Sequence, residues 1–246
     1  VEIFEREKNI GVDNSIIEGV TRLVNKYGKI IVLEDDLVTS EGYLKYMNEA
    51  LSLYEYDDRV MGISGYNFPN SNNSFGTFFI YGGTNPWGWG TWKRAWDYFI
   101  QDSKFLYNTI SNLDEKKIKQ FNFDYTFDYL EMLKSSVNTN EKPYDIRWYA
   151  SVFLKGGLGL WPSKSLVQNI GHDGSGTHCG NANYYYNKTL SKEIMVTKIP
   201  ILESPTGREE IINFYAKTNQ KNFLQKIKNA VKKFILKKSN DRNLNL

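Results

Sequence analysis

The chain has 246 residues, of which 41% are hydrophobic, so it holds enough apolar material for one large domain or two small ones. Aromatic residues reach 15%, a content that serves either a large core or flat faces that bind sugars or bases. The single cysteine, Cys179, excludes an internal disulfide framework and a zinc site built from cysteines. No apolar run is long enough to cross a bilayer.

The net charge of +3 conceals an asymmetry between the body of the chain and its C-terminal part. Residues 217–246 hold eight Lys and one Arg against one acid, Asp241, which leaves 22 of the 31 basic and 27 of the 28 acidic residues to the body. An acidic body argues against an ordinary nucleic-acid-binding domain, and the basic charge needs a local explanation.

The hydrophobic pattern of the first part predicts a strand, a helix and a second strand. We expect a strand at 1–6, then a helix with Asn14 as its N-cap and Gly28 at its end, then a buried strand at 30–33. The apolar positions of this helix are Ile16, Ile17, Val20, Leu23, Val24 and Tyr27. Such a βαβ unit requires its two strands to be parallel.

The remaining chain continues to alternate between strands and helices. A helix capped by Thr39 or Ser40 is expected to turn Leu44, Met47, Leu51 and Tyr54 inward. Further strands are predicted at 60–65, 78–81, 158–161 and 165–169, and further helices through 96–99, within 111–136 in two pieces, at 145–155 and at 219–238. We therefore expect one α/β domain over residues 1–215 and a basic tail over residues 216–246.

Three consecutive carboxylates, Glu34, Asp35 and Asp36, follow the strand predicted at 30–33. Ligands of open α/β sheets collect at the carboxyl ends of strands, and adjacent like charges need a cation to balance them. A divalent cation bound by one or two carboxylates would keep positions open for phosphates or water. The alternative is an acidic junction solvated at the surface, and these residues alone leave both interpretations open.

A stretch rich in tryptophan and glycine spans residues 86–92. Glycines let bulky rings be presented at unusual angles, and an indole offers a sugar both an apolar face and an N–H donor. We expect Trp87 or Trp89 to lie near a binding site, and Trp92 and Trp96 to belong to the core.

Asp145 and Arg147 lie at the start of the helix predicted at 145–155. Asp145 is a candidate general base that takes a proton from an attacking hydroxyl, although the helix dipole alone also favours an acid there. Arg147 is a candidate for holding a phosphate or orienting the base, and equally for an ordinary ion pair.

The only two histidines, His172 and His178, lie in the glycine-rich stretch 171–180. Two histidines in such a loop favour a ligand or phosphate contact over a structural role. The loop is a candidate lid that closes over substrate.

Residues 219–238 place apolar side chains at helical spacing among lysines. A basic amphipathic helix of this kind is expected to lie on an anionic membrane surface, which predicts a cytoplasmic protein that is peripheral on the inner face of the membrane. The alternative is a helix that packs its apolar side on the domain.

In their order along the chain, these motifs resemble a glycosyltransferase of the GT-A fold, of the N-acetylglucosaminyltransferase I type and its bacterial relatives in surface-polysaccharide synthesis. The residues that carry the resemblance are Leu33–Leu37, the loop around 87–89, Tyr144–Trp148 and 162–178, and it spans roughly residues 1–180. It implies a Rossmann-type mixed sheet flanked by helices. It also implies that the first strand and helix of the family fold are missing, so that the domain is N-terminally incomplete.

The resemblance assigns roles to particular residues. It implies that Asp36 binds Mn²⁺ or Mg²⁺, that Glu34 and Asp35 reach the ribose or donor sugar, and that Asp145 is the base of an inverting displacement. The remaining expected donor contacts are Asn9, Gly11, Trp87, Trp89, Arg147, His172 and His178.

The implied activity is metal-dependent transfer of a hexose from a nucleotide sugar to a hydroxyl of a glycan or lipid-linked acceptor, with no nucleic acid as partner. A nucleotidyltransferase and a non-catalytic carbohydrate-binding protein are the alternatives, because one fold supports several functions.

Overall fold

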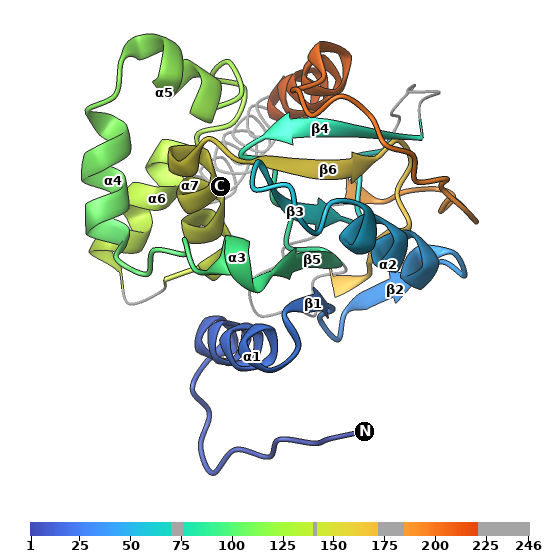
Figure 1. Ribbon diagram of the computed structural model, residues 1–246. Coiled ribbons are helices and arrows are strands. Elements are labelled where there is room, and N and C mark those ends of the chain that lie inside the picture. Colours follow the sequence, from blue (N-terminus) through green and yellow to red (C-terminus); the bar gives the residue numbers. More distant parts are fainter. Residues whose placement is uncertain (70–75, 140–141, 172–184, 221–246) are drawn as a thin grey trace, which may run out of the picture.

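Five strands form a mixed sheet in the computed structural model, which describes residues 1–69, 76–139, 142–171 and 185–220 (Figure 1). In spatial order these strands are β1 (Lys29–Val32), β5 (Trp89–Trp92), β3 (Val60–Ser64), β6 (Leu158–Pro162) and β4 (Thr77–Tyr81). β3 and β6 are parallel, and the other neighbours are antiparallel. Two short strands, β2 (Leu37–Thr39) and β7 (Val167–Asn169), pair separately.

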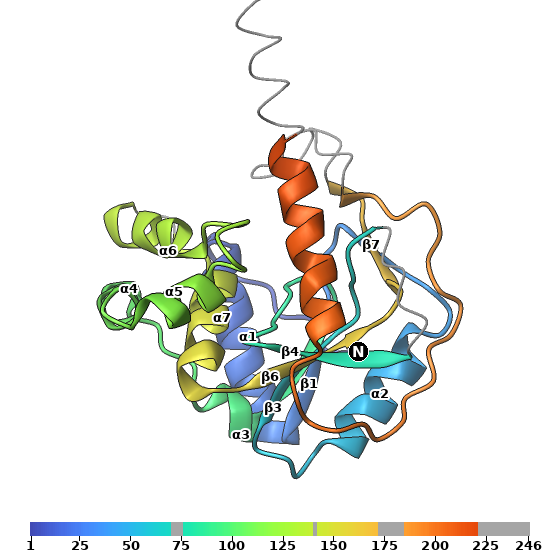
Figure 2. The ribbon, with the colours of Figure 1, turned by 90° about the horizontal axis from the view of Figure 1, so that it is seen from above.

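Helices lie against both faces of this sheet, which confirms the predicted α/β class. The helices of the described chain are α1 (Val12–Tyr27), α2 (Tyr43–Leu53), α3 (Lys93–Trp96), α4 (Ser103–Ser111), α5 (Glu115–Phe121), α6 (Tyr129–Asn138), α7 (Tyr144–Lys155) and a helix over residues 205–220. α2 packs on one face, and α1, α3 and α7 pack on the other. The last helix starts beside β4 (Figure 2) and joins α4, α6 and α7 in a further apolar cluster.

Several predicted elements are present close to their expected bounds. The strands expected at 60–65, 78–81, 158–161 and 165–169 are β3, β4, β6 and β7, and the helix expected at 145–155 is α7. Gly28 ends α1 as predicted, because its φ of 81° is a left-handed conformation that glycine adopts without steric cost. These elements have strong local signals in the sequence.

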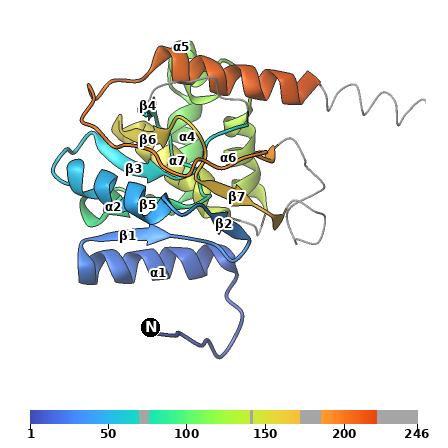
Figure 3. The ribbon, with the colours of Figure 1, turned by 90° about the vertical axis from the view of Figure 1, so that its right-hand side faces the viewer.

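The predicted βαβ unit is wrong. Residues 1–6 form no strand, and β1 is an edge strand that pairs with β5 in antiparallel orientation. The first residues contact α1 instead: the Arg22 guanidinium lies 3.1 Å from the Phe4 ring centroid, and Arg6 pairs with Glu18 at 2.7 Å. Because β1 lies at the edge, it is half-buried rather than buried (Figure 3).

Several details of the predicted helices also need correction. Asn14 does not cap α1, because its amide donates to the Ile10 carbonyl and Gly11 occupies the N-cap. Gly42 starts α2, so the helix presents Tyr43 and Tyr46 to the core and leaves Leu44 57% exposed. Met47, Leu51 and Tyr54 are buried as predicted, so the inward face of α2 is the expected one except at Leu44.

The chain between β5 and α7 departs further from prediction. The stretch 86–92 is only partly loop, since β5 begins at Trp89, and α3 ends at Trp96 rather than continuing to residue 99. α4 was not predicted at all. Its signal is Asp102, whose carboxylate accepts from the backbone N–H groups of Lys104 and Phe105 as an N-cap.

The last helix of the described chain begins at residue 205, well before the helix predicted at 219–238. It runs across residue 216, where the predicted tail begins, and Thr218 is still buried. Residues 221–246, which hold most of the predicted basic helix, lie outside the described residues. In the described part of the chain, no helix has the length and apolar character needed to span a bilayer.

Candidate functional site

The three predicted acids lie at the carboxyl end of β1, between this strand and the β2–β7 pair. Glu34 and Asp36 are half-buried, whereas Asp35 is exposed. The backbone carbonyl of Asp36 accepts from the Ile170 N–H at 2.9 Å, which ties this turn to the end of β7. The acids therefore occupy the strand end that the sequence predicts for them.

The Asp36 carboxylate has one satisfied and one unsatisfied oxygen. Oδ2 accepts from the Asn169 amide at 3.1 Å, whereas Oδ1 is buried and has no hydrogen-bond partner among the described residues. An added Cβ at Gly171 would lie 2.5 Å from Oδ2, so this position accepts only glycine without a shift. A buried acceptor without a partner costs about 1–3 kcal/mol, which a bound cation or donor would recover.

These residues fit a metal ion that takes most of its ligands from substrate and water. The described residues contain no group of three or more His, Cys, Asp or Glu side chains that could hold an ion. Mg²⁺ and similar ions bind to proteins through one or two carboxylates together with waters and substrate phosphates. Asp36 supplies one such carboxylate, while His172 and His178 lie outside the described residues.

The start of α7 is fixed from α1. The Tyr144 backbone N–H donates to Asp13 Oδ1 at 2.6 Å, which supplies the cap that Pro143 cannot provide. The Asp145 carboxylate accepts the N–H of Ile146 at 2.8 Å. Asp145 therefore takes part in capping the helix, as the helix-dipole interpretation of the sequence expects. Asp13 shares this role.

Tyr144 joins the two acidic groups into one site. Its hydroxyl donates to Glu34 Oε1 at 3.1 Å, and its neighbour in sequence is Asp145. The ring of Tyr144 stacks on Trp89, with centroids 6.1 Å apart. Tyr144 lies 110 positions from Glu34 in the sequence, so only the fold brings this contact together.

Burial raises the pKa of Glu34 to about 7. The Tyr144 hydrogen bond opposes this shift, while the charges of Asp36, Asp145 and Asp35 add to it. Burial likewise raises the pKa of Asp145, supported by the charge of Asp13 and opposed by the Ile146 N–H. Carboxylates shifted toward neutrality suit proton transfer at physiological pH.

The Glu34 shift predicts a pH dependence of stability. Between pH 4.5 and about 7 the folded state binds more protons than the unfolded state, so the free energy of unfolding should fall as pH rises through this window. The loss should be on the order of 2–3 kcal/mol, and Glu34→Gln should remove it. Urea unfolding of both proteins at pH 4.5, 5.5, 6.5 and 7.5 measures this; parallel pH profiles would contradict the shift.

Asp145 lines a small pocket of about 60 Å³. Aromatic side chains form much of its wall, and the others come from residues 83–86 and from α6, α7 and the last helix. The aromatic members are Phe123, Tyr129, Tyr149, Trp161 and Tyr215. A candidate base in the wall of a pocket that has both aromatic and polar lining groups fits a ligand site.

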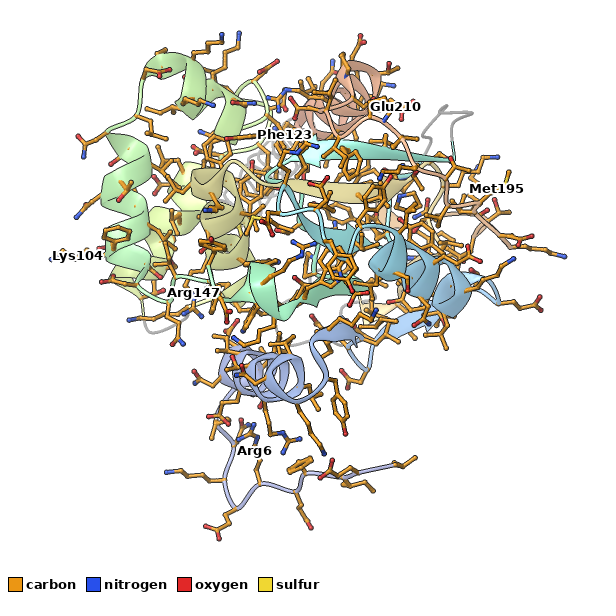
Figure 4. The ribbon with its side chains drawn as sticks, viewed as in Figure 1. Arg6, Lys104, Phe123, Arg147, Met195 and Glu210 are labelled. Carbon is orange, nitrogen blue, oxygen red and sulfur yellow. The ribbon has the colours of Figure 1, made fainter. Side chains whose placement is uncertain are left out.

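Arg147, an expected donor contact, is held by backbone groups of the protein itself. The side chain is buried, and its guanidinium donates to three backbone carbonyls: Pro143 at 3.1 Å, Gln101 at 3.2 Å, and Lys142 (Figure 4). Through these bonds the guanidinium holds the segment before α7 against the connection between α3 and α4. Arg147 therefore positions the start of α7, and its expected contact with a phosphate stays a prediction.

The tryptophans divide differently from the prediction. Trp92 and Trp96 are in the core as expected, but Trp89 is also buried, at 2% exposed, among Trp96, Trp148 and Tyr144. Its ring supports Tyr144 and cannot form a wall for a sugar. Trp87 is half-buried, edge-on to Tyr66, and stays a candidate ligand contact.

Asn9 and Gly11 form an exposed turn before α1, in which the Asn9 side chain accepts the Gly11 N–H at 2.8 Å. Their expected contact with the nucleotide base, like the contacts of Asp35 with the donor, stays a prediction. Nothing in the sequence indicates the roles of Asp13, Asn169 and the Tyr144 hydroxyl. Pro143 has no side chain that could cap α7, which indicates that another residue accepts the hydrogen bond at the helix start, but the sequence does not say which residue.

Neither a scan against protein-family models nor a search of curated proteins gives a match for this chain.

Proposed function

We propose that the chain is a metal-dependent, inverting glycosyltransferase of the GT-A fold, acting in polysaccharide biosynthesis. It would move a sugar from a nucleotide-sugar donor to a hydroxyl of a glycan or lipid-linked acceptor. The observation that carries this proposal is the Tyr144–Glu34 hydrogen bond, because it unites the acids at the end of β1 with Asp145 at the start of α7. Such a reaction needs both a charged donor site and a separate proton acceptor.

In this proposal Asp36 holds the ion through its unpartnered Oδ1. When bound, Mn²⁺ or Mg²⁺ would act as a Lewis acid toward a diphosphate leaving group. Asp145 takes the proton of the acceptor hydroxyl, and burial keeps its affinity for that proton high. Glu34 is close to half-protonated at neutral pH, so it can donate a hydrogen bond to the donor sugar or accept one.

Two half-buried acids with raised pKa values favour a catalyst over a passive carbohydrate-binding protein. A product assay distinguishes a nucleotidyltransferase from a glycosyltransferase, because the first releases pyrophosphate and the second releases a nucleoside mono- or diphosphate. We also propose that the protein binds the anionic cytoplasmic surface of a membrane, because residues 217–246 are rich in basic side chains.

A thermal-shift screen tests the donor and metal site together. Ligand at 100 times its Kd stabilises the folded state by about 2.7 kcal/mol, so the matching nucleotide sugar with Mn²⁺ should raise Tm by several degrees. Asp36→Ala should lose the manganese-dependent part of this rise. Asp97→Ala, which removes an acid on the surface of the molecule, should keep it. Equal rises in both variants would exclude Asp36 as the metal ligand.

A further inference from the structure

Three consecutive residues that are not glycine adopt left-handed backbone conformations. Phe123, Asp124 and Tyr125 have φ values of 45°, 56° and 62°. Left-handed helical conformation costs roughly 1–2 kcal/mol for each such residue, and it normally occurs at single positions. Strain of this kind persists where the surrounding structure enforces it, and it clusters at ligand-binding elements.

The last helix holds this turn in place through Arg208. Its Nη2 donates to the Gln120 carbonyl and to Asp124 Oδ1, both at 3.2 Å. The guanidinium carbon also lies 4.9 Å from the centroid of the Phe123 ring. Arg208 thus contacts the end of α5, the side chain of the turn and the ring that the turn presents.

The turn places Phe123 in the wall of the Asp145 pocket. Phe123 is buried, at 3% exposed, and its position beneath the last helix is visible in Figure 4. Tyr129 and Tyr215 also line the pocket, and their hydroxyl oxygens are 2.7 Å apart. The pocket therefore combines aromatic walls with the paired hydroxyls of Tyr129 and Tyr215, and its lining also includes Thr84, Asn85 and the proposed base.

The size and chemistry of the pocket select a class of occupant. Its volume of about 60 Å³ holds a few water molecules but not a sugar ring, so it fits a substituent of a ring. The Asp145 carboxylate disfavours an anionic substituent. An acetamido group matches the remaining features, because its methyl group suits the aromatic walls and its carbonyl oxygen accepts from a tyrosine hydroxyl.

We propose that this pocket takes the acetamido group of an N-acetylated acceptor sugar. Phe123, Tyr129 and Tyr215 are its specificity-determining residues, and Arg208 is a positioning residue that fixes Phe123. The assignment to the acceptor, rather than the donor, rests on the proposed function, in which Asp145 faces the acceptor hydroxyl.

Ligand-observed NMR titrations of the full chain test this with two probes, methyl N-acetyl-β-D-glucosaminide and methyl β-D-glucopyranoside. A well-fitted substituent is worth at least about tenfold in affinity, so the acetamido probe should bind at least tenfold more tightly, with its strongest saturation transfer at the acetyl methyl. Tyr129→Phe combined with Tyr215→Phe should lose most of this preference. Tyr81→Phe, which removes a tyrosine hydroxyl bonded to the Phe153 carbonyl outside the pocket, should keep it.

Equal affinity for the two probes, or an unchanged preference in the double variant, would overturn the proposal. Arg208→Gln should weaken the preference while leaving the affinity for the glucopyranoside within about twofold. If Arg208→Gln lost affinity for both probes together, Arg208 would have only a structural role and would not be a positioning residue of the pocket. The titration uses neither donor nor metal, so its result is independent of transferase activity, and a failure of either proposal can be recognised by itself.

Discussion

Asp145→Asn should lower the rate of sugar transfer by about 10²–10⁴-fold, the usual contribution of a positioned general base. The change keeps the shape of the side chain and its hydrogen bond from the Ile146 N–H, but it removes the proton acceptor. Burial already penalises the charge of Asp145, so stability should stay the same or rise slightly. Nucleotide release from the donor found by thermal shift measures the rate, with acceptor saccharide present.

The same variant should bind donor and manganese like the wild type, because Asp36 and Glu34 are unchanged. Asp114→Asn is the matched control, since Asp114 is an acid at a helix start that accepts the Lys117 N–H and lies outside the site. If Asp145 served only as a cap, the two variants would behave alike. Normal turnover by Asp145→Asn would refute the base assignment and, with it, the proposed mechanism.

Arg147→Met should cost about 3 kcal/mol or more in the free energy of unfolding. The methionine fills much of the space but leaves the carbonyls of Pro143, Gln101 and Lys142 without their donors. Each buried group that loses its partner costs about 1–3 kcal/mol. Urea unfolding, with Tm as a second measure, determines the loss.

Arg6→Met is the control for this prediction, because Arg6 and its partner Glu18 are exposed (Figure 4). Exposed ion pairs contribute about 0–1 kcal/mol, so this variant should unfold almost like the wild type. An Arg147→Met protein of normal stability with selectively weakened donor binding would instead assign Arg147 a phosphate-binding role.

The elements that could be predicted are those whose signals are local. A buried run of β-branched and apolar residues identifies β3, and glycine in a left-handed conformation ends α1 and α7. The pairing of β1 could not be predicted, because the local pattern of a strand does not say which other strand it joins. In the structure β1 pairs with β5, whose residue Trp92 lies opposite Lys29.

The candidate site divides in the same way. Short-range patterns were enough to predict that Glu34, Asp35 and Asp36 follow a strand and that Asp145 starts a helix. The hydrogen bond of Tyr144 to Glu34, the Asp13 cap on α7 and the contacts of Arg147 with backbone carbonyls could be seen only in the folded chain. Burial, hydrogen-bond partners and pKa shifts depend on groups that are distant in sequence, and packing alone brings those groups together.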